Sequence, residues 1–192
     1  MYLRFTVSRS SLPAYITDGT PDVEVYRHMN AALRTYAADT TSDDRRAELL
    51  EAWLPLTRTI VSALEKVPTT SATVYRGVGG DWSIYGPHYR QGRVVRFSGF
   101  TSTSATATTA YVLAHEGHGA EPKDVWLFKL TTMSAKPLSG LSMYEGEREF
   151  VLPPFSTFVV TFVATCQVEA AGDTAVPFVG LAELVTDHEY VV

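Results

Sequence analysis

The sequence predicts an α+β fold, and three observations lead to it. The chain has 192 residues, of which 45% are hydrophobic and 19% charged, so it can bury a core. Residues 1–70 carry apolar side chains at helical spacing, whereas short runs rich in Val, Phe, Tyr and Thr follow from residue 73 onward. Helices precede strands instead of alternating with them, which favours α+β over βαβ architecture. We expect one domain over residues 1–192, mainly helical over 1–70 and mainly β over 71–192.

The first predicted helix begins after Thr20. Thr20 is a suitable N-cap residue, and Pro21 fits the first helical position. Asp22 and Glu24 place negative charge in the first turn, where the helix dipole favours it. Apolar residues then recur at spacings of three and four, at Tyr26, Met29, Leu33 and Tyr36. This periodicity predicts a helix with one buried stripe.

A second predicted helix begins near residues 41–42, with Asp43 and Asp44 in its first turn. Its apolar residues include Leu49, Leu50, Trp53 and Leu54. Pro55 should end or kink this helix, because proline lacks the backbone donor that a helix interior requires. The spacing of Leu56, Ile60 and Leu64 nevertheless supports a continuation to residues 67–68.

The remainder of the chain has the composition of strands separated by turns. We expect strands near residues 73–78, 94–103, 125–132, 148–152, 157–168 and 178–185. One helix, at about residues 107–115, interrupts them. The sequence contains no internal repeat, low-complexity tract or evident linker, which again favours a single domain.

Composition and charge argue against several classes of protein. The 16 Lys and Arg residues against 21 Asp and Glu give a net charge of −5, which disfavours binding to nucleic-acid phosphates. The single cysteine, Cys166, excludes an internal disulfide framework and a cysteine cluster for structural zinc. The sequence contains no run of about 18 apolar residues, so it predicts no membrane-spanning helix. The first residues lack a secretory-signal pattern, so we expect a cytoplasmic protein, or a secreted or delivered effector without its signal.

The first chemically suggestive motif is Val74-Tyr-Arg-Gly-Val78. Arg76 would present a planar guanidinium that suits a phosphate through two parallel hydrogen bonds. Gly77 would let a ligand approach the backbone closely. The alternative is an arginine on an edge strand that faces water.

The second motif is Phe97-Ser-Gly-Phe-Thr-Ser-Thr-Ser104. Phe97 and Phe100 would anchor this segment in a core. The adjacent hydroxyl groups both donate and accept hydrogen bonds, so they can brace another polar side chain or a ribose. The alternative is an ordinary strand end that leads into a helix cap.

The third motif is Ser142-Met-Tyr-Glu-Gly-Glu-Arg-Glu149. If the segment is extended, Glu147 and Glu149 lie on the same face, where two like charges are unfavourable without a cation or a substrate. The alternative is a solvated hairpin turn. Because Glu149 leads into Phe150-Val-Leu152, we expect its carboxylate at the edge of a core.

The order of these motifs is more specific than any one of them. Arg76 precedes Ser102 by 26 residues, and Ser102 precedes Glu149 by 47. In this order the motifs resemble the arginine–serine–glutamate class of mono-ADP-ribosyltransferases, which includes clostridial binary toxins and arginine-specific ecto-enzymes. Residues 26–34 and 63–78 are similar to the family's first helices and first NAD-binding strand. Glu149-Phe-Val-Leu-Pro-Pro154 is similar to its Glu-Val-Leu-Leu-Pro strand.

The resemblance implies an ADP-ribosyltransferase-like fold, with two packed, mostly antiparallel sheets around an NAD cleft and N-terminal helices. It implies that Arg76 binds an NAD phosphate and that the backbone of Gly77 binds the nicotinamide amide. Ser102 would position the catalytic glutamate, which is Glu149. The other implied residues are Thr103 and Ser104, which support the pocket, and Glu147 and Tyr144, which recognise the arginine acceptor.

The expected reaction is transfer of ADP-ribose from NAD to an arginine side chain, with NAD glycohydrolase activity on the side. Cleavage of the ribose–nicotinamide bond develops positive charge on the ribose, which a carboxylate stabilises. NAD is then a substrate, the partner is an acceptor protein with an exposed arginine, and neither metal nor membrane nor nucleic acid takes part. The alternatives are a glycohydrolase that acts mainly on water and a degenerate domain that only binds NAD or a partner. His115 and His118 are spaced too closely for the zinc-protease motif, so we expect a loop there.

Overall fold

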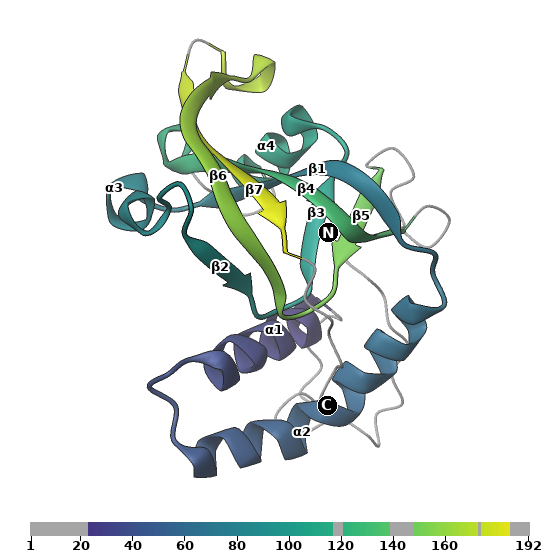
Figure 1. The fold of residues 1–192 in the computed structure, drawn as a ribbon. Helices are drawn as coiled ribbons and strands as arrows, with labels where there is room; N and C mark the ends of the chain where they lie inside the picture. The colour runs from purple at the N-terminus through teal and green to yellow at the C-terminus, as the bar shows by residue number, and fades with distance from the viewer. Residues whose placement is uncertain (1–22, 117–120, 139–147, 173, 185–192) are drawn as a thin grey trace.

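The α+β class predicted from the sequence is confirmed. The structure is a computed structural model that describes residues 23–116, 121–138, 148–172 and 174–184 (Figure 1). Its helices are α1 Val23–Ala37, α2 Asp43–Glu65, α3 Trp82–Tyr85 and α4 Ala107–His115. Its strands are β1 Thr70–Gly79, β2 Val94–Phe97, β3 Thr101–Ser104, β4 Val125–Pro137, β5 Glu149–Leu152, β6 Ser156–Gln167 and β7 Ala175–Glu183. The bounds of α4 are those predicted, whereas the short helix α3 was not predicted.

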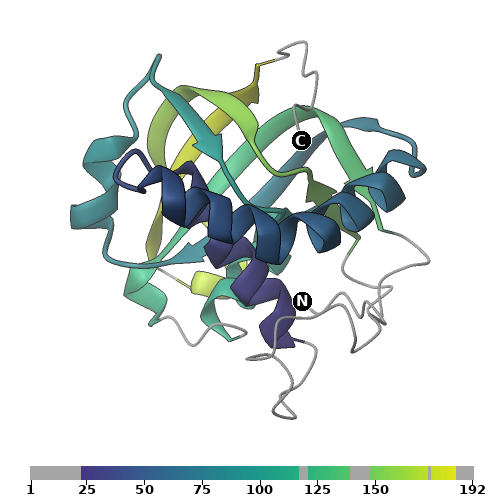
Figure 2. The same cartoon turned by 90° about the horizontal axis from the view of Figure 1, so that it is seen from below.

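The two N-terminal helices form a layer on one side of the sheet (Figure 2). The predicted stripe of α1 is confirmed: Met29 and Leu33 are buried in a core that also contains Trp53 and Ile60 of α2. Phe100, Leu138 and Val151 complete this core from the sheet side. Thr20 and Pro21, the predicted start of α1, lie outside the described residues.

Helix α2 continues through Pro55 without ending. Its 23 residues start at Asp43 after the N-cap Ser42, and the ribbon bends along its length in Figure 1. A proline in a helix interior costs about 3 kcal/mol. The second half of the helix offsets this cost because it buries Thr57, Ile60 and Leu64. The predicted continuation of the helix beyond Pro55 is therefore confirmed.

The sheet differs in one respect from the two packed sheets that the resemblance implied. Seven strands are hydrogen-bonded in the order β1-β3-β5-β4-β7-β6-β2, and β1 also pairs with β4. Only β4 and β7 run parallel, so the expectation of mostly antiparallel pairing is confirmed. Strand β4 joins the two parts of the sheet, β1-β3-β5 and β7-β6-β2. It can do so because it is 13 residues long and pairs first with β7 and then, at Lys136 and Pro137, with β5. One pair of residues, Tyr75 and Ser104, joins β1 to β3.

The carboxylate of Glu183 secures strand β4 between these two pairings. It accepts hydrogen bonds from the Thr132 hydroxyl at 2.7 Å, and from the backbone N–H groups of Met133 and Ser134 at 2.6 and 3.0 Å. The Ser134 hydroxyl also donates to it. Four donors on one carboxylate tie the end of β7 to β4.

The prediction of one strand over residues 94–103 is wrong. Two strands, β2 and β3, occupy this range, with a break at residues 98–100. Strand β2 pairs with β6, and β3 pairs with β5, so the chain crosses from one part of the sheet to the other. Gly99 permits this crossing beside α1, because a Cβ atom there would lie 2.6 Å from Oδ1 of Asn30.

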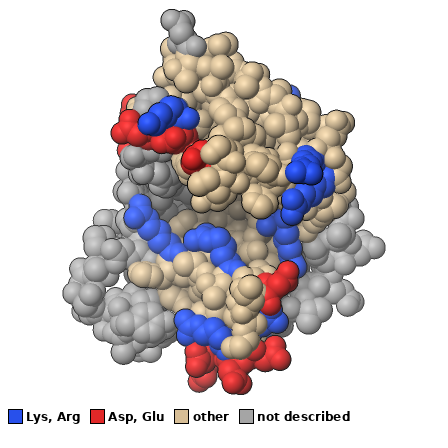
Figure 3. All heavy atoms as spheres, turned by 90° about the vertical axis from the view of Figure 1, so that its left-hand side faces the viewer, with Lys and Arg blue, Asp and Glu red and all other residues tan. Residues whose placement is uncertain are grey.

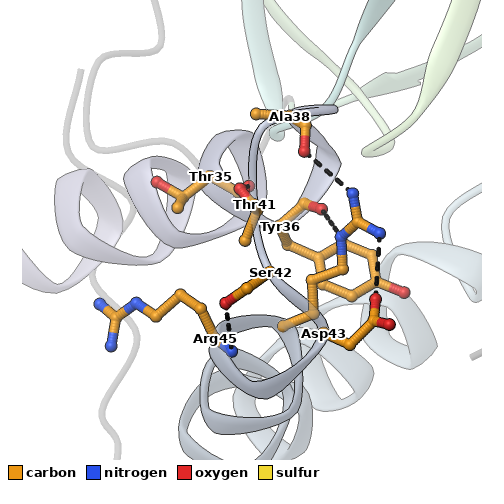
Figure 4. Close-up of polar contacts among 8 residues, drawn as sticks. Thr35, Tyr36, Ala38, Thr41, Ser42, Asp43 and Arg45 are labelled. Carbon is orange, nitrogen blue, oxygen red and sulfur yellow. Dashed lines mark hydrogen bonds and ion pairs between the residues drawn. The ribbon is translucent and has the colours of Figure 1, made fainter.

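A guanidinium group connects the two N-terminal helices at their corner. The Arg46 side chain donates to the carbonyl oxygens of Tyr36 at 3.3 Å and Ala38 at 3.0 Å, at the C-terminal end of α1 (Figure 4). It also lies 3.6 Å from the fully exposed carboxylate of Asp43. The two bonds to carbonyl groups satisfy acceptors that the helix end leaves without an intrahelical partner.

We expect Arg46→Met to lower the free energy of unfolding by about 1–2 kcal/mol, because it removes two charged hydrogen bonds and keeps the apolar stem. Urea denaturation measures this loss. The matched control is Arg45→Met, whose guanidinium bonds Glu48 in an exposed pair and is expected to matter by less than about 0.5 kcal/mol. Equal losses for the two variants would contradict a specific role of Arg46.

Candidate active site

Three strands bring the first, second and third sequence motifs together. Strand β3 lies between β1 and β5, with Ser104 opposite both Tyr75 and Glu149. Arg76 follows Tyr75 on β1, and Ser102 lies two residues before Ser104 on the same face of β3. Residues far apart in the sequence therefore meet where β1, β3 and β5 adjoin.

The carboxylate of Glu149 is held by Ser102. The Ser102 hydroxyl donates to Oε1 of Glu149 at 2.7 Å, and Glu149 is only 6% exposed. Glu149 begins the strand that buries Val151 and Leu152 completely. The prediction that this carboxylate lies at the edge of a core is confirmed, and the alternative of a solvated turn is wrong for Glu149.

Arg76 also contacts Ser102, at its backbone. Its Nη1 donates to the backbone carbonyl of Ser102 at 2.8 Å. Burial lowers the pKa of the guanidinium; Tyr26 raises it, and the positive charge of Arg34 lowers it. An arginine stays protonated at neutral pH in spite of such shifts, so Arg76 is a fixed cation. The alternative of an arginine on a free edge is wrong, because β1 pairs with both β3 and β4.

The neighbouring residues of the motifs have structural roles of their own. The hydroxyl of Thr103 donates to the carbonyl of Phe150 at 3.0 Å, and both Thr103 and Ser104 are buried. Gly77 packs against α4, where a Cβ atom would lie 2.1 Å from the carbonyl oxygen of Ala110. Close helix packing thus explains the glycine. The predicted contacts of these three residues with NAD stay predictions.

Helix α1 adds three residues to which the sequence analysis assigned no role in the site. Tyr26, Asn30 and Arg34 follow one another at intervals of four, so they lie along one face of the helix. The Tyr26 hydroxyl donates to the carbonyl of Phe100 at 2.8 Å. Burial raises the pKa of Tyr26, while nearby Arg76 lowers it and Glu149 raises it. No local pattern signals this role, because Tyr26 also fits the apolar stripe of α1, and Asn30 and Arg34 look like ordinary polar residues of an amphipathic helix.

The site holds cations beside the carboxylate of Glu149. The positive charge of Arg34 lowers the pKa of Arg76, so the two guanidinium groups lie within electrostatic reach of each other. Figure 3 shows Lys and Arg side chains gathered around a hollow at the middle of one face.

Two of the predicted site residues, Tyr144 and Glu147, lie outside the described residues, as does His118. Within the described part of the chain, no group of three or more His, Cys, Asp or Glu side chains could hold a metal ion. None of the described helices is both long enough and apolar enough to cross a membrane.

Comparison with known proteins gives the family of the chain. The model of a family described as NAD:arginine ADP-ribosyltransferase matches residues 10–171. A Mycobacterium avium (strain 104) protein assigned as the NAD(+)–arginine ADP-ribosyltransferase Mav is 31% identical over 135 residues, which are 70% of this chain and 14% of that protein. The Gallus gallus erythroblast NAD(P)(+)–arginine ADP-ribosyltransferase is 33% identical over 106 residues, 55% of this chain and 31% of that protein. The chain thus spans less than a third of either relative.

Solved structures show the same fold. The ADP-ribosyltransferase Vis, a toxin of Vibrio splendidus, superposes with a TM-score of 0.61 at 23% identity, over 93% of this chain and 79% of that one. HopU1 of Pseudomonas syringae superposes with a TM-score of 0.58 at 23% identity, over 86% and 66%.

Proposed function

The chain belongs to the NAD:arginine ADP-ribosyltransferase family, and from this we propose that it transfers ADP-ribose from NAD to an arginine side chain and releases nicotinamide. The observation that carries the proposal is the hydrogen-bonded set of Arg76, Ser102 and Glu149. In this proposal NAD is a substrate, and the chain is a catalytic domain that uses no metal.

Glu149 would act on the bond between ribose and nicotinamide. As this bond breaks, its electron pair leaves with neutral nicotinamide, and positive charge develops on the ribose. A buried carboxylate stabilises this charge more strongly than water does, and the stabilisation grows as the bond lengthens. Ser102 supports this role because its hydrogen bond fixes the orientation of the carboxylate before NAD binds.

Arg76 would bind the diphosphate of NAD, with Arg34 as a second cation. The bond from Nη1 to Ser102 holds the Arg76 side chain in place, so that less freedom is lost on binding. We propose that the backbone of Gly77 binds the nicotinamide amide. Thr103 and Ser104 would support the pocket through their buried hydroxyl groups on β3.

The acceptor would be an arginine on the surface of another protein. An arginine is protonated and therefore a poor nucleophile, so a carboxylate must orient it and help remove a proton. We propose Glu147 for this role and Tyr144 for acceptor recognition. The structure of Vis in complex with agmatine, at a TM-score of 0.52, supports a guanidinium acceptor for this fold.

The test is incubation of the protein with labelled NAD and agmatine. We expect nicotinamide release together with labelled agmatine, and we expect Glu147→Gln to lose transfer by about 100-fold while it retains release. Release without transfer by the unmodified protein would indicate a glycohydrolase. Tight NAD binding without release would indicate a degenerate domain, and either result would overturn the proposal.

A further inference from the structure

Asn30 is the only asparagine of the chain, and it is buried on α1 with 6% of its surface exposed. Its amide makes two hydrogen bonds to the backbone of a single residue on the other side of the core. Nδ2 donates to the carbonyl of Phe100 at 3.1 Å, and Oδ1 accepts from the N–H of Phe100 at 2.9 Å. The planar amide carries one donor edge and one acceptor edge, so it can satisfy both backbone groups at once.

This contact occurs where the backbone has no strand partner. Phe100 lies in the break between β2, which ends at Phe97, and β3, which begins at Thr101. The amide of Asn30 takes the place of a neighbouring strand there, and Gly99 leaves room for it. Phe100 itself is buried in the core under α1 and α2. Phe100, which directly precedes β3, is thus held by the helical layer through both its backbone and its side chain.

The proposed active site begins two residues later. Ser102 contacts Arg76 through its carbonyl and Glu149 through its hydroxyl, so both contacts depend on the position of β3. Strand β3 has only four residues, and its pairing with β1 consists of one residue pair. A short strand with so little pairing on one side needs another support at its start.

We infer that Asn30 is a positioning residue: through Phe100 it sets where the hydroxyl of Ser102 holds the carboxylate of Glu149. This inference rests on the proposed function. Asn30 acts through the backbone of β3, so its loss should reduce the rate of nicotinamide release more than the binding of NAD.

The test is Asn30→Leu, which keeps a side chain of similar size and removes both hydrogen bonds. We expect kcat for nicotinamide release to fall by about 10- to 100-fold, with KM for NAD changed by less than about 3-fold, because small displacements of reacting groups carry large rate costs. The matched control is Leu33→Ala on the same helix. It removes buried apolar contacts and should destabilise the fold while kcat of the folded protein stays within about 2-fold.

A double-mutant cycle with Ser102→Ala tests the route of the effect. If Asn30 acts through Ser102, the double variant should have the same kcat as Ser102→Ala, within about 2-fold. Multiplicative losses, or a kcat of Asn30→Leu equal to that of Leu33→Ala, would overturn the inference.

Amide hydrogen exchange separates this inference from the proposed function. In Asn30→Leu, the amides of residues 101–104 should exchange faster than in Leu33→Ala at matched stability. Equal exchange would refute the positioning role even if the enzyme is active. An unmodified protein that releases no nicotinamide would overturn the proposed function, and the exchange experiment would still decide the role of Asn30.

Discussion

Glu149→Gln is expected to reduce kcat for nicotinamide release from NAD by at least about 100-fold. Glutamine has the same shape and still accepts the hydrogen bond from Ser102, so the variant removes the negative charge and keeps this contact. The charge matters most when the ribose becomes cationic, which means that the transition state loses more than bound NAD does. KM for NAD should therefore change by less than about 5-fold. Steady-state measurement of released nicotinamide gives both constants.

The matched control for this variant is Glu183→Gln. Glu183 is also a hydrogen-bonded carboxylate in the sheet, but the hydrogen bonds described for it come from residues 132–134 and secure β4 to β7. We expect it to lower stability and to leave kcat of the folded protein within about 3-fold. If Glu149→Gln behaves like Glu183→Gln, Glu149 does not stabilise the transition state.

Arg76→Lys should reduce kcat/KM for NAD by about 100-fold, chiefly through KM. Lysine keeps the positive charge but lacks the planar fork, so the paired bonds to a phosphate are lost along with the bond to Ser102. Two hydrogen bonds to charged groups together contribute about 3 kcal/mol, which corresponds to about two powers of ten. Steady-state kinetics and direct titration with NAD measure the effect.

Arg46→Lys is the control for the loss of a guanidinium fork. Arg46 also makes two hydrogen bonds with its fork, but they join α1 to α2 and not the proposed site. We expect reduced stability and an unchanged kcat/KM from this variant. If Arg76→Lys binds NAD as well as the unmodified protein, Arg76 does not bind the diphosphate.

Local patterns were sufficient for most elements of the fold. The spacing of apolar residues predicts the buried face of α1, and the start of α2 after Ser42 agrees with the start predicted near residues 41–42. The break between β2 and β3 was missed although Ser98-Gly99, in the middle of residues 94–103, is a local turn signal. What local patterns do not specify is where the chain goes at this break: Gly99 and Phe100 meet Asn30, which lies 70 residues before Phe100.

The residue types of the candidate site, and their order along the chain, are readable from the motifs around Arg76, Ser102 and Glu149. Their contacts are not, because hydrogen bonds across 26 and 47 residues depend on which strands pair, and local periodicity specifies only which face of a strand is buried. The contribution of α1 likewise became visible only in three dimensions. Asn30 and Arg34 look like ordinary polar residues of an amphipathic helix until the fold brings Asn30 to the backbone of Phe100 and Arg34 within electrostatic reach of Arg76.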